Sequence, residues 1–127
     1  MTEHAELDLP LSARYATTVR AVAASMAATI SMSIDDIDDL RLGVNEAISV
    51  LTDLDDGASG AGRLHIRFEV DTDRIRVVAS RHGVDDHPPV EVDVLAERIL
   101  GAVVDEYSLD DSGVVQLVKR VRSDGDS

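Results

Sequence analysis

Apolar and polar residues alternate along several stretches of the chain, with the period of two that is typical of half-buried β-strands. These stretches are residues 5–11, 64–70, 74–80, 107–109 and 114–121. The second and third are separated only by Asp71-Thr72-Asp73, and therefore predict an antiparallel hairpin. The last two flank a turn at 110–113 and predict another hairpin. Because Pro10 has no amide hydrogen for a ladder, the first stretch is predicted to lie at a sheet edge or to end a strand there.

Three further stretches have apolar residues at the three- and four-residue spacing of amphipathic helices. They are residues 13–31, 34–51 and 92–104. The apolar stripes are Val19/Val22/Met26/Ile30, then Ile37/Leu40/Val44/Ala47/Ile48/Leu51, and then Val92/Leu95/Ile99 with Ala102 or Val103. Ser33 is positioned to cap the second helix, and Asp35 and Asp36 stand in its first turn, where the helix dipole favours negative charge.

The predicted order is strand, helix, helix, hairpin, helix, hairpin. This order indicates an α+β fold, a two-layer sandwich in which a mixed or antiparallel sheet carries the helices on one face. A chain of 127 residues has the size of one domain. We expect residues 1–122 to form that domain and residues 123–127 to be a flexible tail.

Composition excludes several classes of function. The formal net charge of -13 disfavours direct binding to nucleic acid, and the absence of cysteine removes thiolate metal sites and cysteine nucleophiles. The sequence has no apolar run of about 18 residues and no secretory signal pattern, so we expect no membrane span and a cytoplasmic protein.

One segment holds residue types that could bind a metal ion. It contains His82, Asp85, Asp86 and His87. No regular secondary structure fixes the spacing of these side chains, so a solvated acidic loop is the favoured interpretation and no metal site is expected.

The most informative stretch is residues 35–47, Asp-Asp-Ile-Asp-Asp-Leu-Arg-Leu-Gly-Val-Asn-Glu-Ala. It resembles the second helix of the anti-sigma-factor serine kinases of the GHKL (Bergerat, histidine-kinase-like ATPase) superfamily. The order and spacing of the other elements follow that family over nearly the whole chain. The resemblance implies a histidine-kinase-like ATPase fold with Mg-ATP as cofactor. It also implies that Glu46 is catalytic and that Gly83 belongs to the nucleotide-binding motif.

Three parts of the nucleotide site depart from the family pattern. Val50 stands where the family has an asparagine that ligates magnesium, and Arg81 stands where it has an aspartate that reads adenine. Residues 84–96, where a glycine-rich lid is implied, contain no glycine and are acidic. We therefore expect a degenerate site without bound Mg-ATP, and a protein that acts by binding rather than by catalysis.

The resemblance implies an anti-sigma factor of a stress-response system, which sequesters an alternative sigma factor and is countered by an anti-anti-sigma factor. It also implies a homodimer. Degenerate members occur among actinobacterial anti-sigma factors, and eleven arginines against one lysine agree with a GC-rich source. The family's first helix presents an arginine to protein partners, so Arg20, with Arg14 and Thr17 at spacings of three, is the predicted partner-binding surface. Two alternatives stay open: an active serine kinase that uses Glu46, and a stand-alone regulatory module without a sigma partner.

Overall fold

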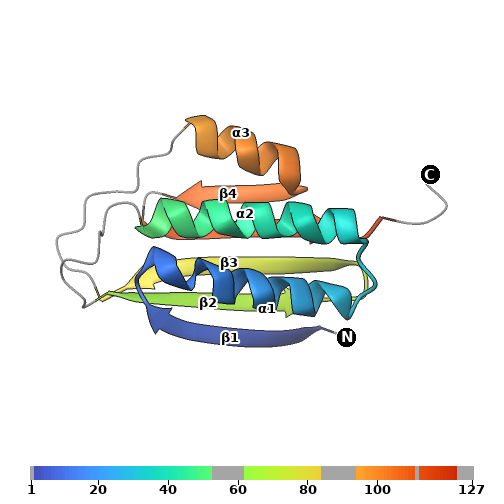
Figure 1. Ribbon diagram of the computed structural model, residues 1–127, viewed down its shortest axis with the longest axis horizontal. Coiled ribbons are helices and arrows are strands. Elements are labelled where there is room, and N and C mark those ends of the chain that lie inside the picture. Colours follow the sequence, from blue (N-terminus) through green and yellow to red (C-terminus); the bar gives the residue numbers. More distant parts are fainter. Residues whose placement is uncertain (1, 53–61, 84–93, 111, 123–127) are drawn as a thin grey trace.

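A computed structural model describes residues 2–52, 62–83, 94–110 and 112–122 (Figure 1). Five strands form one sheet in the order β1-β2-β3-β5-β4, and every neighbouring pair is antiparallel. The strands are β1 (Glu3–Pro10), β2 (Arg63–Val70), β3 (Arg74–His82), β4 (Glu106–Asp110) and β5 (Val114–Arg120). The helices are η1 (Ala13–Tyr15, a 3-10 turn), α1 (Ala16–Ala28), α2 (Ile34–Thr52) and α3 (Val94–Val103).

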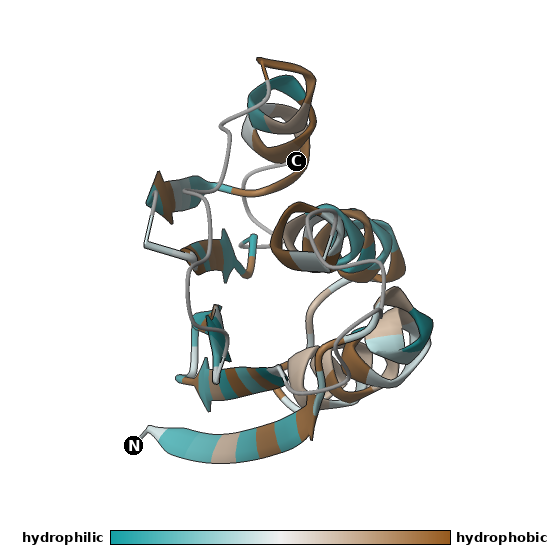
Figure 2. Ribbon diagram, turned by 90° about the vertical axis from the view of Figure 1, so that its left-hand side faces the viewer, coloured by the Kyte–Doolittle hydropathy of each residue, from teal (hydrophilic) through white to brown (hydrophobic). Residues whose placement is uncertain are grey.

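The three α-helices lie on one side of the sheet (Figure 2), which confirms the predicted α+β two-layer sandwich. Alternate residues of the central strands point toward the helices and are buried, as the period of two predicts. On β2 and β3 these residues are Leu64, Ile66, Phe68, Ile75, Val77 and Ala79. On β2 and β3 the opposite face carries mainly polar side chains, and none of the described helices covers it.

Both predicted hairpins are present. Strands β2 and β3 pair in the register that puts Phe68 opposite Val77, and β4 pairs with β5. Strand β1 lies at the edge of the sheet and ends at Pro10, as the missing proline amide predicts.

The first helix is shorter than the predicted span 13–31. It begins as a 3-10 turn, in which the hydroxyl of Ser12 accepts a hydrogen bond from the amide of Arg14. It ends because Ser31 adopts a left-handed backbone, with φ of 62°, and the amide of Met32 turns back to the carbonyl of Ala27. The three- and four-residue spacing of apolar side chains extends beyond both ends of α1, so periodicity alone could not show where the helix begins and ends.

Helix α2 matches its prediction closely. The hydroxyl of Ser33 accepts a hydrogen bond from the amide of Asp36 at 3.1 Å, which confirms the predicted cap. The helix contacts α1, α3, β3 and β5. Its buried apolar residues are Leu40, Val44, Ala47, Ile48, Val50 and Leu51.

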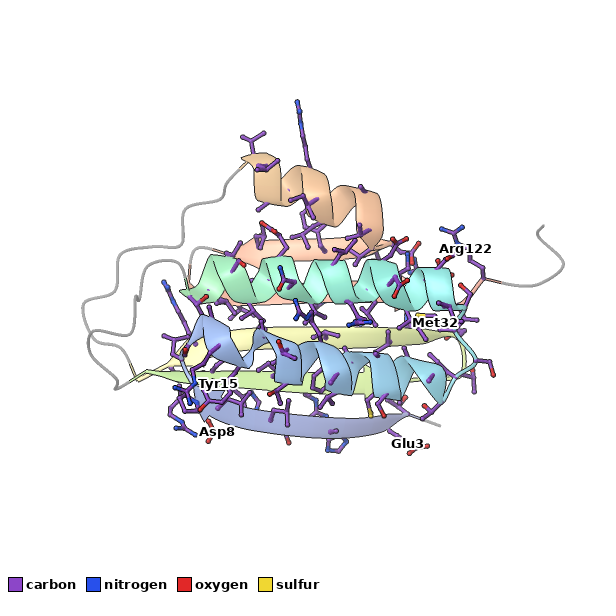
Figure 3. The ribbon with its side chains drawn as sticks, viewed as in Figure 1. Glu3, Asp8, Tyr15, Met32 and Arg122 are labelled. Carbon is purple, nitrogen blue, oxygen red and sulfur yellow. The ribbon has the colours of Figure 1, made fainter. Side chains whose placement is uncertain are left out.

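An ionic cluster around the buried side chains of Asp36 and Lys119 joins the beginning of α2 to strand β5 on the helix-covered face of the sheet. The amino group of Lys119 on β5 lies 3.6 Å from Asp36 and 3.7 Å from Asp39, and donates a hydrogen bond of 2.9 Å to the carbonyl of Val103. Arg122, visible at the N-terminal end of α2 in Figure 3, lies 3.6 Å from Asp36. Lys119 therefore faces the negative end of α3, and Asp36 stands at the positive end of α2.

The predicted apolar stripe of the third helix is wrong at Leu95, whereas Val103 packs against the core as predicted and Val92 lies outside the described residues. Leu95 is 61% exposed, whereas Ala96 and Leu100 are buried. Helix α3 is apolar on most of its circumference, so its spacing fits two stripes: the predicted one with Leu95 and the buried one with Ala96 and Leu100. Close packing against α2 selects the stripe that contains the small Ala96.

Several predicted features lie outside the described residues. They are most of the altered segment 84–96, of which 84–93 are not described, and the tail at 123–127. Among the helices that the structure describes, none is long and apolar enough to cross a membrane.

Gly43 on α2 lies close to the residues at the end of α3. A Cβ atom added at this position would lie 2.9 Å from Cγ1 of Val104, which is buried and β-branched and so has few alternative rotamers. We therefore expect Gly43→Ala to lower the free energy of unfolding by about 1–3 kcal/mol, although alanine ordinarily favours a helix. Urea unfolding monitored by circular dichroism measures the change.

Gly101 on α3 is the matched control. A Cβ atom there would lie 3.8 Å from Cε1 of Tyr107, an ordinary contact distance. Gly101→Ala should raise the free energy of unfolding by up to about 1 kcal/mol. Equal gains from both substitutions would contradict the close approach at Gly43.

Candidate functional site

The implied nucleotide-site residues gather at one end of the molecule. Helix α2 and strand β3 end there, and α3 begins there, at the left of Figure 1. Glu46 and Val50 lie in the last turns of α2, and Arg81 and Gly83 lie at the end of β3. The fold therefore places Glu46 and Arg81, which are 35 positions apart in the sequence, at the same end of the molecule.

Position 50 does not offer the magnesium ligand that the resemblance implies. The side chain of Val50 is 8% exposed and belongs to the apolar core, and it carries no oxygen for a hard cation. Glu46, one turn earlier, is half-buried. Glu46 thus lies on the helix that the resemblance implies, but Val50 cannot help its carboxylate to hold a metal ion.

Arg81 occupies the last inward-facing position of β3. It is 9% exposed, and its side chain lies against the backbone of Gly113, where a Cβ atom would come within 2.9 Å of Nε. A guanidinium only donates hydrogen bonds, whereas the amino group of adenine needs an acceptor. The residues at positions 50 and 81 therefore do not fit the magnesium and adenine contacts of the family. Gly83 does keep a left-handed backbone, with φ of 76°.

The turn between β4 and β5 places Gly113 beside Arg81. Its amide donates to the carbonyl of Asp110, while both the hydroxyl and the amide of Ser112 donate to the Asp110 carboxylate. The hydroxyl of Ser112, and then its amide, lower the pKa of Asp110 below its ordinary value, because they stabilise the ionised form. The ionised aspartate thus helps to define a turn whose glycine makes room for a buried arginine.

The candidate metal ligands are only partly described. His82 lies on the outward face of β3, where its Nε2 is 2.9 Å from the hydroxyl of Ser80. Asp85, Asp86 and His87 fall outside the described residues. Within the described part of the chain, no three His, Asp or Glu side chains gather as ligands for a metal ion.

The predicted partner surface is divided by the structure. Arg20 and Thr17 lie together, with Nη2 of the arginine donating to the threonine hydroxyl at 3.1 Å. Arg14 belongs to η1 instead of α1, and its guanidinium lies 5.1 Å from the ring centre of Tyr15, at the start of the helix layer in Figure 3. Arg14 therefore does not continue the α-helical face of the other two residues.

Arg20 has a second contact that the sequence analysis missed. Its Nη1 donates to the side-chain carbonyl of Asn45 on α2 at 2.8 Å. Asn45 precedes Glu46 in the informative stretch, but no single-sequence pattern pairs it with a residue 25 positions earlier. The buried cluster around Lys119 was missed for the same reason: it depends on which elements become neighbours.

A groove of about 520 Å³ lies at the other end of α1, next to the turn between β2 and β3. It is lined by Glu3, Met26, Thr29, Ile30, Ser31, Val70, Asp71 and Thr72. None of the predicted site residues lines this groove, so it is separate from both candidate surfaces.

Comparison with known proteins gives relatives of one kind. The chain is 28% identical over 130 residues to the serine-protein kinase RsbW of Bacillus licheniformis, a match that covers 88% of this chain and 81% of the relative. It is 30% identical over 82 residues to the serine-protein kinase RsbW of Staphylococcus epidermidis, covering 64% of this chain and 52% of that protein. No protein-family model matches the chain.

Among solved structures, the chain is similar to the RsbU and RsbW domains of Rv1364c from Mycobacterium tuberculosis. The TM-score is 0.63 at 16% identity, over 94% of this chain and 32% of that one. The chain thus spans about four-fifths of its Bacillus relative and about a third of this larger structure. The resemblance to the anti-sigma-factor serine kinases of the GHKL type is confirmed, and so is their fold.

Proposed function

We propose that the protein is an anti-sigma factor, which binds an alternative sigma factor in the cytoplasm and keeps it from RNA polymerase. An anti-anti-sigma partner competes for the protein and so releases the sigma factor. The similarity to RsbW over most of the chain supports this role. The observation that carries it on this chain is the cation at Arg20, which is held in place on the helix layer of a protein with a net charge of -13.

In this proposal the switch needs no chemical step on the protein. The two partners compete by mass action, and the difference between their affinities decides how much sigma factor is free. An arginine in a fixed position can pair with a carboxylate of the partner through two parallel hydrogen bonds, which supplies both affinity and orientation.

A second candidate is an ATP-dependent serine kinase that phosphorylates its antagonist. The relatives of this chain are serine-protein kinases, which favours this candidate, and Glu46 stands where the family's catalytic carboxylate is implied. Against it are the apolar side chain at Val50 and the cation at Arg81. Nucleotide binding separates the two candidates.

We predict that Arg20→Ala weakens binding to the sigma factor at least about tenfold, which corresponds to 1.4 kcal/mol, because it strands the carboxylate of the partner. The probes are the alternative sigma factors of the source organism, each purified without polymerase and tested by surface plasmon resonance. Circular dichroism checks that the variant folds.

Two controls accompany this measurement. Arg74→Ala removes the same charge from an exposed position at the start of β3, and His82→Ala alters the end of that strand. Both should bind like the parent. If Arg20→Ala also binds like the parent while His82→Ala fails, the interface lies over the former nucleotide site. If the parent binds none of the sigma factors, the chain is a module without a sigma partner.

We predict that Mg-ATP binds with a dissociation constant weaker than about 1 mM, since loss of a metal ligand and of the adenine acceptor costs roughly 1–3 kcal/mol each. Isothermal titration calorimetry measures the constant. Micromolar binding would show that other residues replace positions 50 and 81, and would favour the kinase.

The double substitution Val50→Asn with Arg81→Asp tests which alteration matters. Restored binding in a folded variant would assign the loss to these two side chains. If the folded variant still fails to bind, the altered residues 84–96 dominate.

A further inference from the structure

The guanidinium of Arg20 is held from two directions. Nη1 donates to the side-chain carbonyl of Asn45 on α2 at 2.8 Å, and Nη2 donates to the hydroxyl of Thr17 on α1 at 3.1 Å. A free arginine samples many rotamers and loses that freedom when it binds a partner. Here two hydrogen bonds fix the side chain before any partner arrives, which lowers the entropic cost of binding.

The buried Nε atom of the Arg20 guanidinium defines the side from which a partner can approach the group. Nε of Arg20 is inaccessible to solvent and has no hydrogen-bond partner. The edge of the guanidinium that carries Nε therefore faces the protein. Each terminal nitrogen has two N–H groups, and the hydrogen bonds to Asn45 and Thr17 use one on each, so one N–H remains on Nη1 and one on Nη2.

We propose that Asn45 is a positioning residue, which presents the Nη1 and Nη2 end of Arg20 to a carboxylate on an acidic segment of the protein partner. The recognition surface then spans α1 and α2 instead of α1 alone. This inference rests on the proposed function, because it concerns how the same surface recognises its partner. It adds a residue that the partner-surface prediction did not contain.

The neighbouring side chains agree with a surface that continues onto α2. Leu42, one turn before Asn45, is 56% exposed and offers an apolar contact next to the charged one. On α1 the same-face neighbours of Arg20 are small: Thr17 lies three positions before it and Ala24 four positions after it. A partner can thus reach the guanidinium without a large side chain in the way.

Asn45→Ala tests the role directly. It removes the acceptor for Nη1 but leaves the charge of Arg20, so binding to the sigma factor should fall about five- to tenfold. Thermal unfolding should shift by no more than about 5 °C, since a single partly exposed hydrogen bond is lost. In a double-mutant cycle, Arg20→Ala with Asn45→Ala should bind no more weakly than Arg20→Ala alone.

Asn45→Asp separates positioning from a merely structural tie between the helices. A carboxylate at this position keeps, and strengthens, the contact with Arg20, so the protein should be as stable as the parent. It also competes with the carboxylate of the partner, so sigma binding should be weaker than for Asn45→Ala. If Asn45 only ties α1 to α2, Asn45→Asp should bind like the parent, and the proposal is overturned. Ser49→Ala, a half-buried polar residue on the same helix, serves as the control and should bind like the parent.

A partner-free measurement keeps the two proposals distinguishable. In nitrogen-15 NMR spectra, hydrogen bonds at both terminal nitrogens should slow rotation about the bonds to Cζ and give Arg20 separate Nη1 and Nη2 signals. Asn45→Ala should merge them. If the parent already shows merged signals, Asn45 does not position Arg20, whichever partner binds. If the signals are separate but no sigma factor binds, the positioning survives and the proposed function fails.

Discussion

The fold depends on the burial of α2 between two other helices and the sheet. Only one face of the sheet is apolar, and α2 is the element that contacts α1, α3, β3 and β5 together. Gly43 permits the close approach on one side, and the Lys119 cluster fixes the beginning of the helix on another. Removing one partner of a buried ion pair leaves an uncompensated charge, so Asp36 and Lys119 constrain each other and hold the helix in one register.

The same burial decides what the former nucleotide site can do. Residues 46 and 50 lie one turn apart, but only the first keeps a polar side chain, while Val50 has become part of the core. Arg81 fills its position next to Gly113. A surface that needs no such pocket remains on the helix layer, where Arg20 is fixed by Thr17 and Asn45. The helix that carries the altered site therefore also supports the candidate partner surface.

Sequence periodicity predicted the fold well and the contacts between elements poorly. The hairpins, the edge position of β1 and the Ser33 cap follow from local rules, because alternation, proline and capping act within a few residues. The exposure of Leu95 did not follow, since a helix that is apolar on most of its circumference does not specify which face is buried. Asn45 and Lys119 act across long sequence separations, which no local pattern specifies. The roles of Glu46, Gly83 and the Arg20 surface came from the family resemblance and remain proposals for this chain.

The central claim is that the protein controls its partner by binding alone, without nucleotide. The most direct test measures how much sigma factor the protein keeps from binding RNA polymerase when a fixed amount of the anti-anti-sigma factor is present. The protein is tested once after apyrase has removed nucleotide and once after preincubation of the same mixture with labelled Mg-ATP. If Mg-ATP does not bind the protein, it cannot change the balance between the sigma-bound and sigma-free forms. We therefore predict the same inhibition within about twofold in both conditions, and no transfer of labelled phosphate. Inhibition that requires Mg-ATP, or labelled phosphate on a serine of the anti-anti-sigma factor, would contradict it.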